Sequence, residues 1–140
     1  MPCSKTNIHR LQRIQNVAAK LVTKAGKFDH VTPLLLELHW LPVSFRITFK
    51  VLLLVHKCVL GEAPEYLIDL FESYVPNRNL RSGDKNLLVI HKTRTNFGLK
   101  AFMVHGAKMY NSLDVDLKSE TKLQSFKGHL KTKLFKDAFY

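Results

Sequence analysis

Apolar residues recur every three or four positions along residues 4–25, a spacing that predicts an amphipathic α-helix. Residue 26 is a glycine, which commonly follows the last turn of a helix. We expect the apolar side of this helix to pack against the rest of the protein. That side consists of Ile8, Leu11, Ile14, Val17, Ala18, Leu21, Val22 and Ala25.

Capping residues and prolines set the expected bounds of the next helices. Thr32 and Pro33 suit the first positions of a short helix over residues 33–39. Pro42 disfavours helix in the residue before it, and Ser44 can cap the helix that follows. The helices that we expect after the first one cover residues 33–39, 45–60, 64–73, 99–112 and 121–138.

The helix expected over residues 45–60 is apolar nearly all round at residues 51–55. A helix of this kind belongs in the interior, covered by other helices. Arg46, Lys50 and Lys57 are spaced by four and seven residues, so they share one face and should point outward.

One segment favours a β-strand. Residues 87–91 read Leu-Leu-Val-Ile-His, and a weak pairing near residues 94–97 would give this strand a partner. Residues 75–86 are rich in Pro, Asn, Ser and Gly, which is typical of a loop. The pattern predicts a mainly α fold, a compact bundle of about five to six helices with one short strand or hairpin. We expect residues 1–140 to form a single helical domain whose two halves are divided by the loop at residues 75–86.

The chain is strongly basic, because 22 Lys and Arg residues stand against 11 Asp and Glu residues, a net charge of +11. Residues 1–60 carry +7 and residues 77–140 carry +8, whereas residues 61–76 carry −4. This excess indicates a polyanionic partner, nucleic acid first and an anionic membrane surface second. A Lys-rich solvated surface without a partner is the plainer alternative.

The bases of the first helix and of the residues after it fall within a stripe roughly 100° wide. No acid interrupts this stripe, which favours contact with phosphates over a merely solvated face. We expect it to bind the RNA or DNA backbone with low sequence specificity. The predicted contacts are Arg10, Arg13, Lys20, Lys24 and Lys27, with Arg46, Lys50, Lys127 and Lys131 as further candidates.

Cysteine usage and apolar runs bear on the compartment. Cys3 and Cys58 form neither a Cys-x-x-Cys motif nor a disulfide framework, which favours a reducing, intracellular compartment, nuclear or cytoplasmic. Residues 1–10 lack the apolar stretch of a signal peptide, and the longest apolar run, residues 51–55, is too short to span a bilayer. We expect no membrane partner, although Lys-rich helix faces leave binding to a membrane surface as an alternative.

The sequence offers no catalytic constellation. Its seven histidines include no His-x-x-x-His or His-Glu-x-x-His pair, and no Cys/His cluster has zinc spacing. P-loop, Gly-x-Gly-x-x-Gly and Gly-x-Ser-x-Gly motifs are absent. Asp114 and Asp116 alternate, but a helix cap and loop acids explain them better than a two-metal site. We predict no enzyme activity, no catalytic residue, no metal site and no cofactor.

Five stretches, at residues 11–22, 29–71, 74–82, 111–113 and 126–135, form an ordered set of motifs. They read LQRIQNVAAKLV, DHVTPLLLELHWLPVSFRITFKVLLLVHKCVLGEAPEYLIDLF, YVPNRNLRS, NSL and FKGHLKTKLF. This set resembles the C-terminal region of non-LTR (LINE-type) retrotransposon reverse transcriptases, in particular the chicken-repeat, jockey and Rex-like groups.

The resemblance implies a helical element from the thumb or post-thumb region, downstream of the polymerase palm. Such an element grips the template–primer duplex and has no catalytic residue of its own. The chain contains no Asp-Asp pair, so the resemblance implies a truncated open reading frame that starts after the palm aspartates. Trp40 and Leu41, in the family's central motif, would fill the gap between the short helix and the buried one.

The match to the family is closest in the first two thirds of the chain. Matching residues are Leu11, Gln15, Asn16, Ala18, Ala19, His39, Trp40, Leu41, Pro42, Arg46, Ile47, Phe49, Lys50, Ala63, Pro64, Tyr66, Leu67, Arg78, Leu80, Arg81 and Ser82. Departures come later. The chain has Leu99 and Lys100 where the family often has Asp and Arg, Tyr110 in place of Trp, and Asp114 in place of Pro.

Two functions stay open. The first is a noncatalytic nucleic-acid-binding helical fragment derived from a retrotransposon reverse transcriptase, which contacts phosphates through basic helix faces. The alternative is a protein-interaction module, or an inactive retroelement relic without its own activity. In that case exposed apolar surface would bind the missing palm region or drive self-association.

Overall fold

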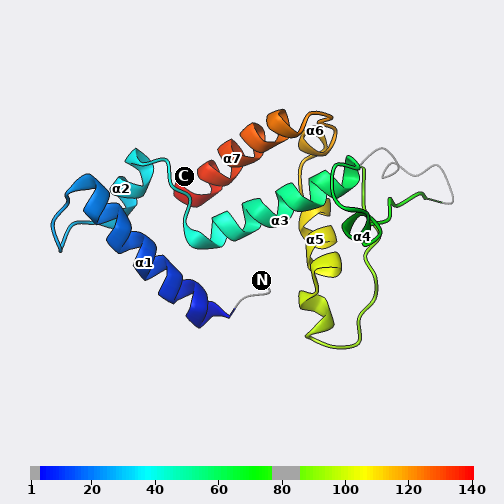
Figure 1. The fold of residues 1–140 in the computed structure, drawn as a ribbon, viewed down its shortest axis with the longest axis horizontal. Coiled ribbons are helices and arrows are strands. Elements are labelled where there is room, and N and C mark those ends of the chain that lie inside the picture. Colours follow the sequence, from blue (N-terminus) through cyan, green and yellow to red (C-terminus); the bar gives the residue numbers. More distant parts are fainter. Residues whose placement is uncertain (1–3, 77–85) are drawn as a thin grey trace. The chain divides into compact units, whose positions relative to one another are not determined.

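The computed structural model describes residues 4–76 and 86–140 (Figure 1). Within these residues the chain is mainly helical and forms no β-sheet, so the predicted mainly α class is confirmed. The helices are α1 (Lys5–Thr23), α2 (Val31–Glu37), α3 (Val43–Val59), α4 (Glu65–Ile68), the 3₁₀ helix η2 (Gly98–Lys100), α5 (Phe102–Asn111), α6 (Val115–Lys118) and α7 (Leu123–Phe139).

The first helix ends two residues earlier than predicted. Lys24, not Gly26, takes the left-handed conformation that ends α1, with φ at 55°. The N–H of Ala25 then donates to the carbonyl of Lys20 over 3.0 Å, which satisfies one of the last carbonyl groups of the helix. The N–H of Gly26 donates to Oδ2 of Asp29 in the following turn instead.

The predicted caps of the next two helices lie inside them. α2 begins before Thr32, and Pro33 falls in its first turn, where a missing N–H costs nothing. α3 begins one residue before Ser44. The N–H of Arg46 donates to the carbonyl of Pro42 over 2.9 Å. The helix does not begin earlier, because Pro42 has no N–H and disfavours helical backbone in Leu41.

The strand predicted at residues 87–91 is reduced to one isolated antiparallel bridge between Ser73 and Leu88. The side-chain amide of Asn111 binds the other edge of this segment, where a further strand would pair. Its Oδ1 accepts from the N–H of Leu88 and its Nδ2 donates to the carbonyl of Leu88, each over 2.8 Å. Both backbone groups of Leu88 are therefore bound to a side chain of α5 rather than to a further strand.

Three further segments differ from the prediction. The helix expected over residues 64–73 is confined to α4. The helix expected over residues 99–112 is split into η2 and α5, because Ala101 has an extended backbone, with φ −58° and ψ 143°. α6 was not predicted, although Asp114 does occupy a helix N-cap position there, as the acidic pair suggested.

The described residues group into two compact units, and the division falls within α3 and α7. One unit contains residues 50–130, and the other contains residues 4–49 with residues 131–140. The loop at residues 75–86, predicted as the divider, lies mostly outside the described residues, because residues 77–85 are not among them. The single domain over residues 1–140 stays a prediction.

Each unit has its own core. In the unit of residues 50–130, His56, Tyr110 and Phe126 have no solvent exposure. In the other unit the most deeply buried side chain is Ala19. Other buried apolar side chains are Leu35, Leu41 and Leu134 in that unit, and Leu52, Val55, Val104, Ala107 and Leu130 in the unit of residues 50–130. In α7, Phe126, Leu130 and Leu134 recur at helical spacing and are buried, whereas Leu123 at its start is half-buried.

Candidate functional site

The side of α1 that packs against the protein is not the apolar side. Its buried residues are Gln15 and Ala19. The predicted inward side is exposed instead: Leu11 at 47%, Ile14 at 66%, Val17 at 59%, Leu21 at 75% and Val22 at 59%. The prediction that the apolar side of α1 packs inward is therefore wrong.

Two glutamines explain this orientation. The Nε2 of Gln15 donates to the carbonyl oxygen of Leu41 over 2.8 Å, and the Oε1 of Gln12 accepts from the N–H of Val43 over 2.8 Å. Val43 is the first residue of α3, so its N–H has no partner inside the helix. The glutamines thus satisfy backbone groups on both sides of Pro42.

A signal for this packing is present in the sequence. Gln12, Gln15, Asn16 and Ala19 are spaced by three, one and three residues and share one side of a helix. A hydropathy pattern does not predict that this polar side is buried, since it treats amide side chains as surface residues. Inward packing of this polar side can be predicted only if the backbone groups near Pro42 that need hydrogen-bond partners are already known.

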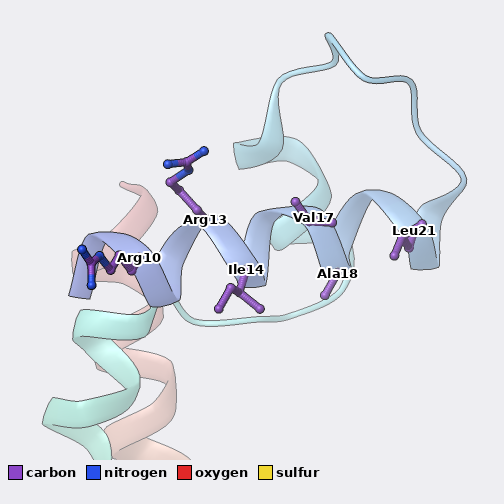
Figure 2. A pocket seen from close by; sticks show the side chains of 6 residues that line it. All are labelled: Arg10, Arg13, Ile14, Val17, Ala18 and Leu21. Atoms are coloured by element: carbon purple, nitrogen blue, oxygen red, sulfur yellow. The ribbon is translucent and has the colours of Figure 1, made fainter. Parts of the chain in front are cut away.

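The exposed side of α1 carries both apolar and basic side chains (Figure 2). An open hollow along the helix is lined by Arg10, Arg13, Ile14, Val17, Ala18 and Leu21. In Figure 2, Arg13 extends from one edge of the helix, whereas Ile14 and Ala18 extend from the opposite edge. The bases thus border the apolar surface and do not lie behind it.

A second hollow lies where α1 meets the following turn and α2. It is lined by Arg13, Asn16, Val17, Lys20, Leu21, Ala25, Lys27 and Val31. The ammonium of Lys20 donates to the carbonyl oxygen of Lys27 over 2.6 Å, which ties the helix to the turn. The ammonium of Lys27 lies 5.7 Å from the ring centroid of Phe28, a side chain that is 90% exposed.

The structure brings part of the predicted phosphate-binding set together. Arg10 and Arg13 line the first hollow, and Arg13, Lys20 and Lys27 line the second. Lys24 is exposed at the end of α1. In the part of the chain that the structure describes, no carboxylate forms an ion pair with any of these five bases. The first acid in the sequence is Asp29, so residues 1–28, with six bases, carry +6.

The four other candidate bases are exposed but are not gathered at α1 by any observed contact. Arg46 on α3 and Lys131 on α7 belong to the same unit as α1. Lys50 and Lys127 belong to the unit of residues 50–130. They remain predicted contacts.

The titratable groups whose pKa values are shifted belong to the unit of residues 50–130 and not to α1. The Nδ1 of His56 lies 3.1 Å from the hydroxyl of Tyr110, and its ring stacks on Phe126 with 3.7 Å between centroids. Burial lowers the pKa of His56, partly opposed by the backbone carbonyl of Glu120, and burial raises the pKa of Tyr110 to about 12. Neither side chain is exposed to solvent, so this cluster stabilises a core and offers no access to a substrate.

Two further observations limit the chemistry of the described residues. Among residues 4–76 and 86–140, no three His, Cys, Asp or Glu side chains come together as a metal site would require. None of the helices there combines the length and apolarity needed to cross a membrane.

Comparison of the chain with protein-family models, with curated proteins and with solved structures gave no match. The resemblance to retrotransposon reverse transcriptases therefore rests on the sequence motifs alone.

Proposed function

We propose that this chain is a noncatalytic nucleic-acid-binding module derived from a non-LTR reverse transcriptase. α1 and the turn after it contact the phosphate backbone through Arg10, Arg13, Lys20, Lys24 and Lys27. The observation that carries the proposal is that four of these bases line the two hollows along α1, that Lys24 is exposed at its end, and that none of the five has an acidic partner among the described residues. Such a protein would act in the nucleus or the cytoplasm.

The spacing of the bases suits a nucleic-acid strand. Arg10 and Lys24 are 14 residues apart, which corresponds to about 21 Å along a helix. Phosphates of one strand follow one another every ~3.4 Å along a B-DNA axis, so α1 can lie over about six of them. Contacts of this kind fix affinity and position but not base sequence.

Salt-titrated binding to a fluorescent duplex tests the proposal. With five phosphate contacts, log K should fall against log salt with a slope of about −4 to −5 on duplex DNA. Arg13→Glu with Lys24→Glu reverses the charge of two exposed side chains that have no observed partner. We expect this variant to bind at least ~100-fold more weakly at moderate salt and to reduce the slope by about 2.

A matched control separates a specific surface from net charge alone. Lys92→Glu with Lys100→Glu makes the same change in net charge at two exposed residues outside the proposed set. It should retain most of the affinity and the slope. Equal losses in both variants, or a salt-independent affinity, would reject α1 as the phosphate-binding surface.

The second candidate is a protein-interaction module, and the exposed apolar side of α1 favours it. Large apolar patches on the surface of a protein commonly mark sites of association. Light scattering at increasing concentration, together with the duplex assay, discriminates between the candidates. Association without nucleic-acid binding would support the second candidate over the first.

A further inference from the structure

The exposed apolar side of α1 contains residues spaced for packing against another helix. Leu11, Ile14, Ala18 and Leu21 are separated by three, four and three residues, the a and d positions of two successive heptads. We call these four residues the seam. The three large members are 47%, 66% and 75% exposed, in chain order, so the described part of the chain leaves about half or more of each side chain uncovered.

We infer that the seam binds an acidic amphipathic helix of a partner protein. This inference supplies a partner for the second candidate function, and it uses the apolar side of α1 rather than phosphate contacts. The small side chain of Ala18 at the middle of the seam allows close approach of a second helix. The seam covers about 15 Å from Leu11 to Leu21, so the partner helix needs about three turns.

Charge selects the partner. Arg10 occupies a g position beside the seam, where interhelical ion pairs form, and Arg13 lines the same hollow. α1 contains no Asp or Glu. A helix with carboxylates along the edge of its apolar side would therefore complement this face, and a basic helix would be repelled.

Two other occupants fit less well. In a second copy of the chain, α1 would again present bases and no acids, so like charges would meet across the interface. A membrane surface needs only an apolar side beside basic residues and places no demand on the spacing of the apolar residues. The seam has the a and d spacing of a helix–helix contact instead.

A synthetic peptide provides the probe. It has three heptads with Leu at positions a and d and Glu at positions e and g, and a matched peptide has Lys at e and g. Fluorescence anisotropy with the full 140-residue chain measures both affinities. We expect the acidic peptide to bind at least ~10-fold more tightly than the basic one.

Two variants test whether the contact is at the seam. Ile14→Gln with Leu21→Gln adds no charge; it should weaken binding of the acidic peptide at least ~10-fold and leave the duplex affinity and its salt slope unchanged. Arg10→Glu with Arg13→Glu should reverse the preference toward the basic peptide. A structural defect would weaken both peptides and would not reverse the order.

Several results would overturn the inference. The first is equal binding of the two peptides, or binding that is insensitive to the seam variant. Loss of helical circular dichroism in the seam variant would show that the protein itself covers these residues. A concentration-dependent mass that the seam variant abolishes would assign the seam to a second copy. Recruitment to phosphatidylserine vesicles that the same variant abolishes would assign it to a membrane.

Discussion

The side-chain Oε1 of Gln12 accepts a hydrogen bond from the backbone N–H of Val43, with 2.8 Å between the two atoms. The bond joins α1 to the first residue of α3 across 31 positions of the sequence. The Nε2 of the same amide donates to Oδ1 of Asn16 over 2.8 Å, so Gln12 uses its two amide atoms in separate bonds. A glutamine of one helix thus acts as the N-terminal cap of another.

Gln12→Leu should therefore destabilise the protein. It leaves the N–H of Val43 without its acceptor, which should lower the free energy of unfolding by about 0.5–2 kcal/mol, as the loss of an N-cap does. Gln12→Glu retains an acceptor near the positive end of α3 and should restore most of the stability. Urea denaturation measures both variants.

The control is Gln124→Leu, made at an exposed glutamine of α7. It should change the free energy of unfolding by less than about 0.5 kcal/mol. If Gln12→Leu is as harmless as this control, the proposed cap does not contribute to stability.

The sequence predicted where helices lie better than which side of each is buried. In α7 the apolar residues at helical spacing, Phe126, Leu130 and Leu134, do lie in the interior. The same reasoning failed for α1, because hydropathy cannot register that Gln12 and Gln15 are needed by backbone groups near Pro42. Four of the five bases of the predicted stripe are nevertheless exposed, and Lys20 is half-buried.

Alanine substitutions of two leucines test the corrected orientation of α1. Leu21 is 75% exposed on α1, and Leu52 is 2% exposed on α3. Leu21→Ala should lower the free energy of unfolding by less than about 0.5 kcal/mol, whereas Leu52→Ala should cost about 2–5 kcal/mol. A large loss for Leu21→Ala in thermal or urea denaturation would mean that this side of α1 is packed after all.

Short elements were less predictable, for a different physical reason. The strand expected at residues 87–91 had the right composition, but it forms only one bridge, and the side chain of Asn111 binds both backbone groups of Leu88 at its other edge. Tyr110 shows the same limit: nothing in its spacing marks it as fully buried, yet its hydroxyl lies 3.1 Å from His56. Contacts between residues distant in the sequence decide these details, and periodicity does not contain them.

Stability should decrease in mild acid because of His56. Burial lowers its pKa below the ordinary value of 6.5, so the folded chain keeps the ring neutral where the unfolded chain binds a proton. The contribution of this group is fully present above pH 6.5 and is lost as the pH falls from 6.5 toward the lowered pKa. Burial also lowers the pKa of His105, which adds to the loss in the same direction.

Two variants isolate the contribution of His56 when urea denaturation is repeated at several pH values. Tyr110→Phe removes the hydroxyl partner but keeps the imidazole, so the fall in stability with decreasing pH should persist. His56→Leu with Tyr110→Phe removes both polar groups from the core and should make the dependence shallower. An unchanged slope in the double variant would show that His56 does not carry the acid sensitivity.

Two glycines inside helices should respond to alanine in opposite directions. A Cβ at Gly106 in α5 would lie 2.9 Å from Cγ2 of Val55 and 3.4 Å from Cζ of Phe71. Val55 is fully buried and cannot move freely, so Gly106→Ala should lower the free energy of unfolding by about 1–3 kcal/mol despite the better helix propensity of alanine. Nothing lies within 4 Å of a Cβ at Gly128 in α7, so Gly128→Ala should raise it by about 0.5–1 kcal/mol. The residue change is identical at both positions, so changes of opposite sign in the free energy of unfolding, measured by urea denaturation, would report the packing of α5 against Val55 and Phe71. Equal stabilisation by both variants would rule that close contact out.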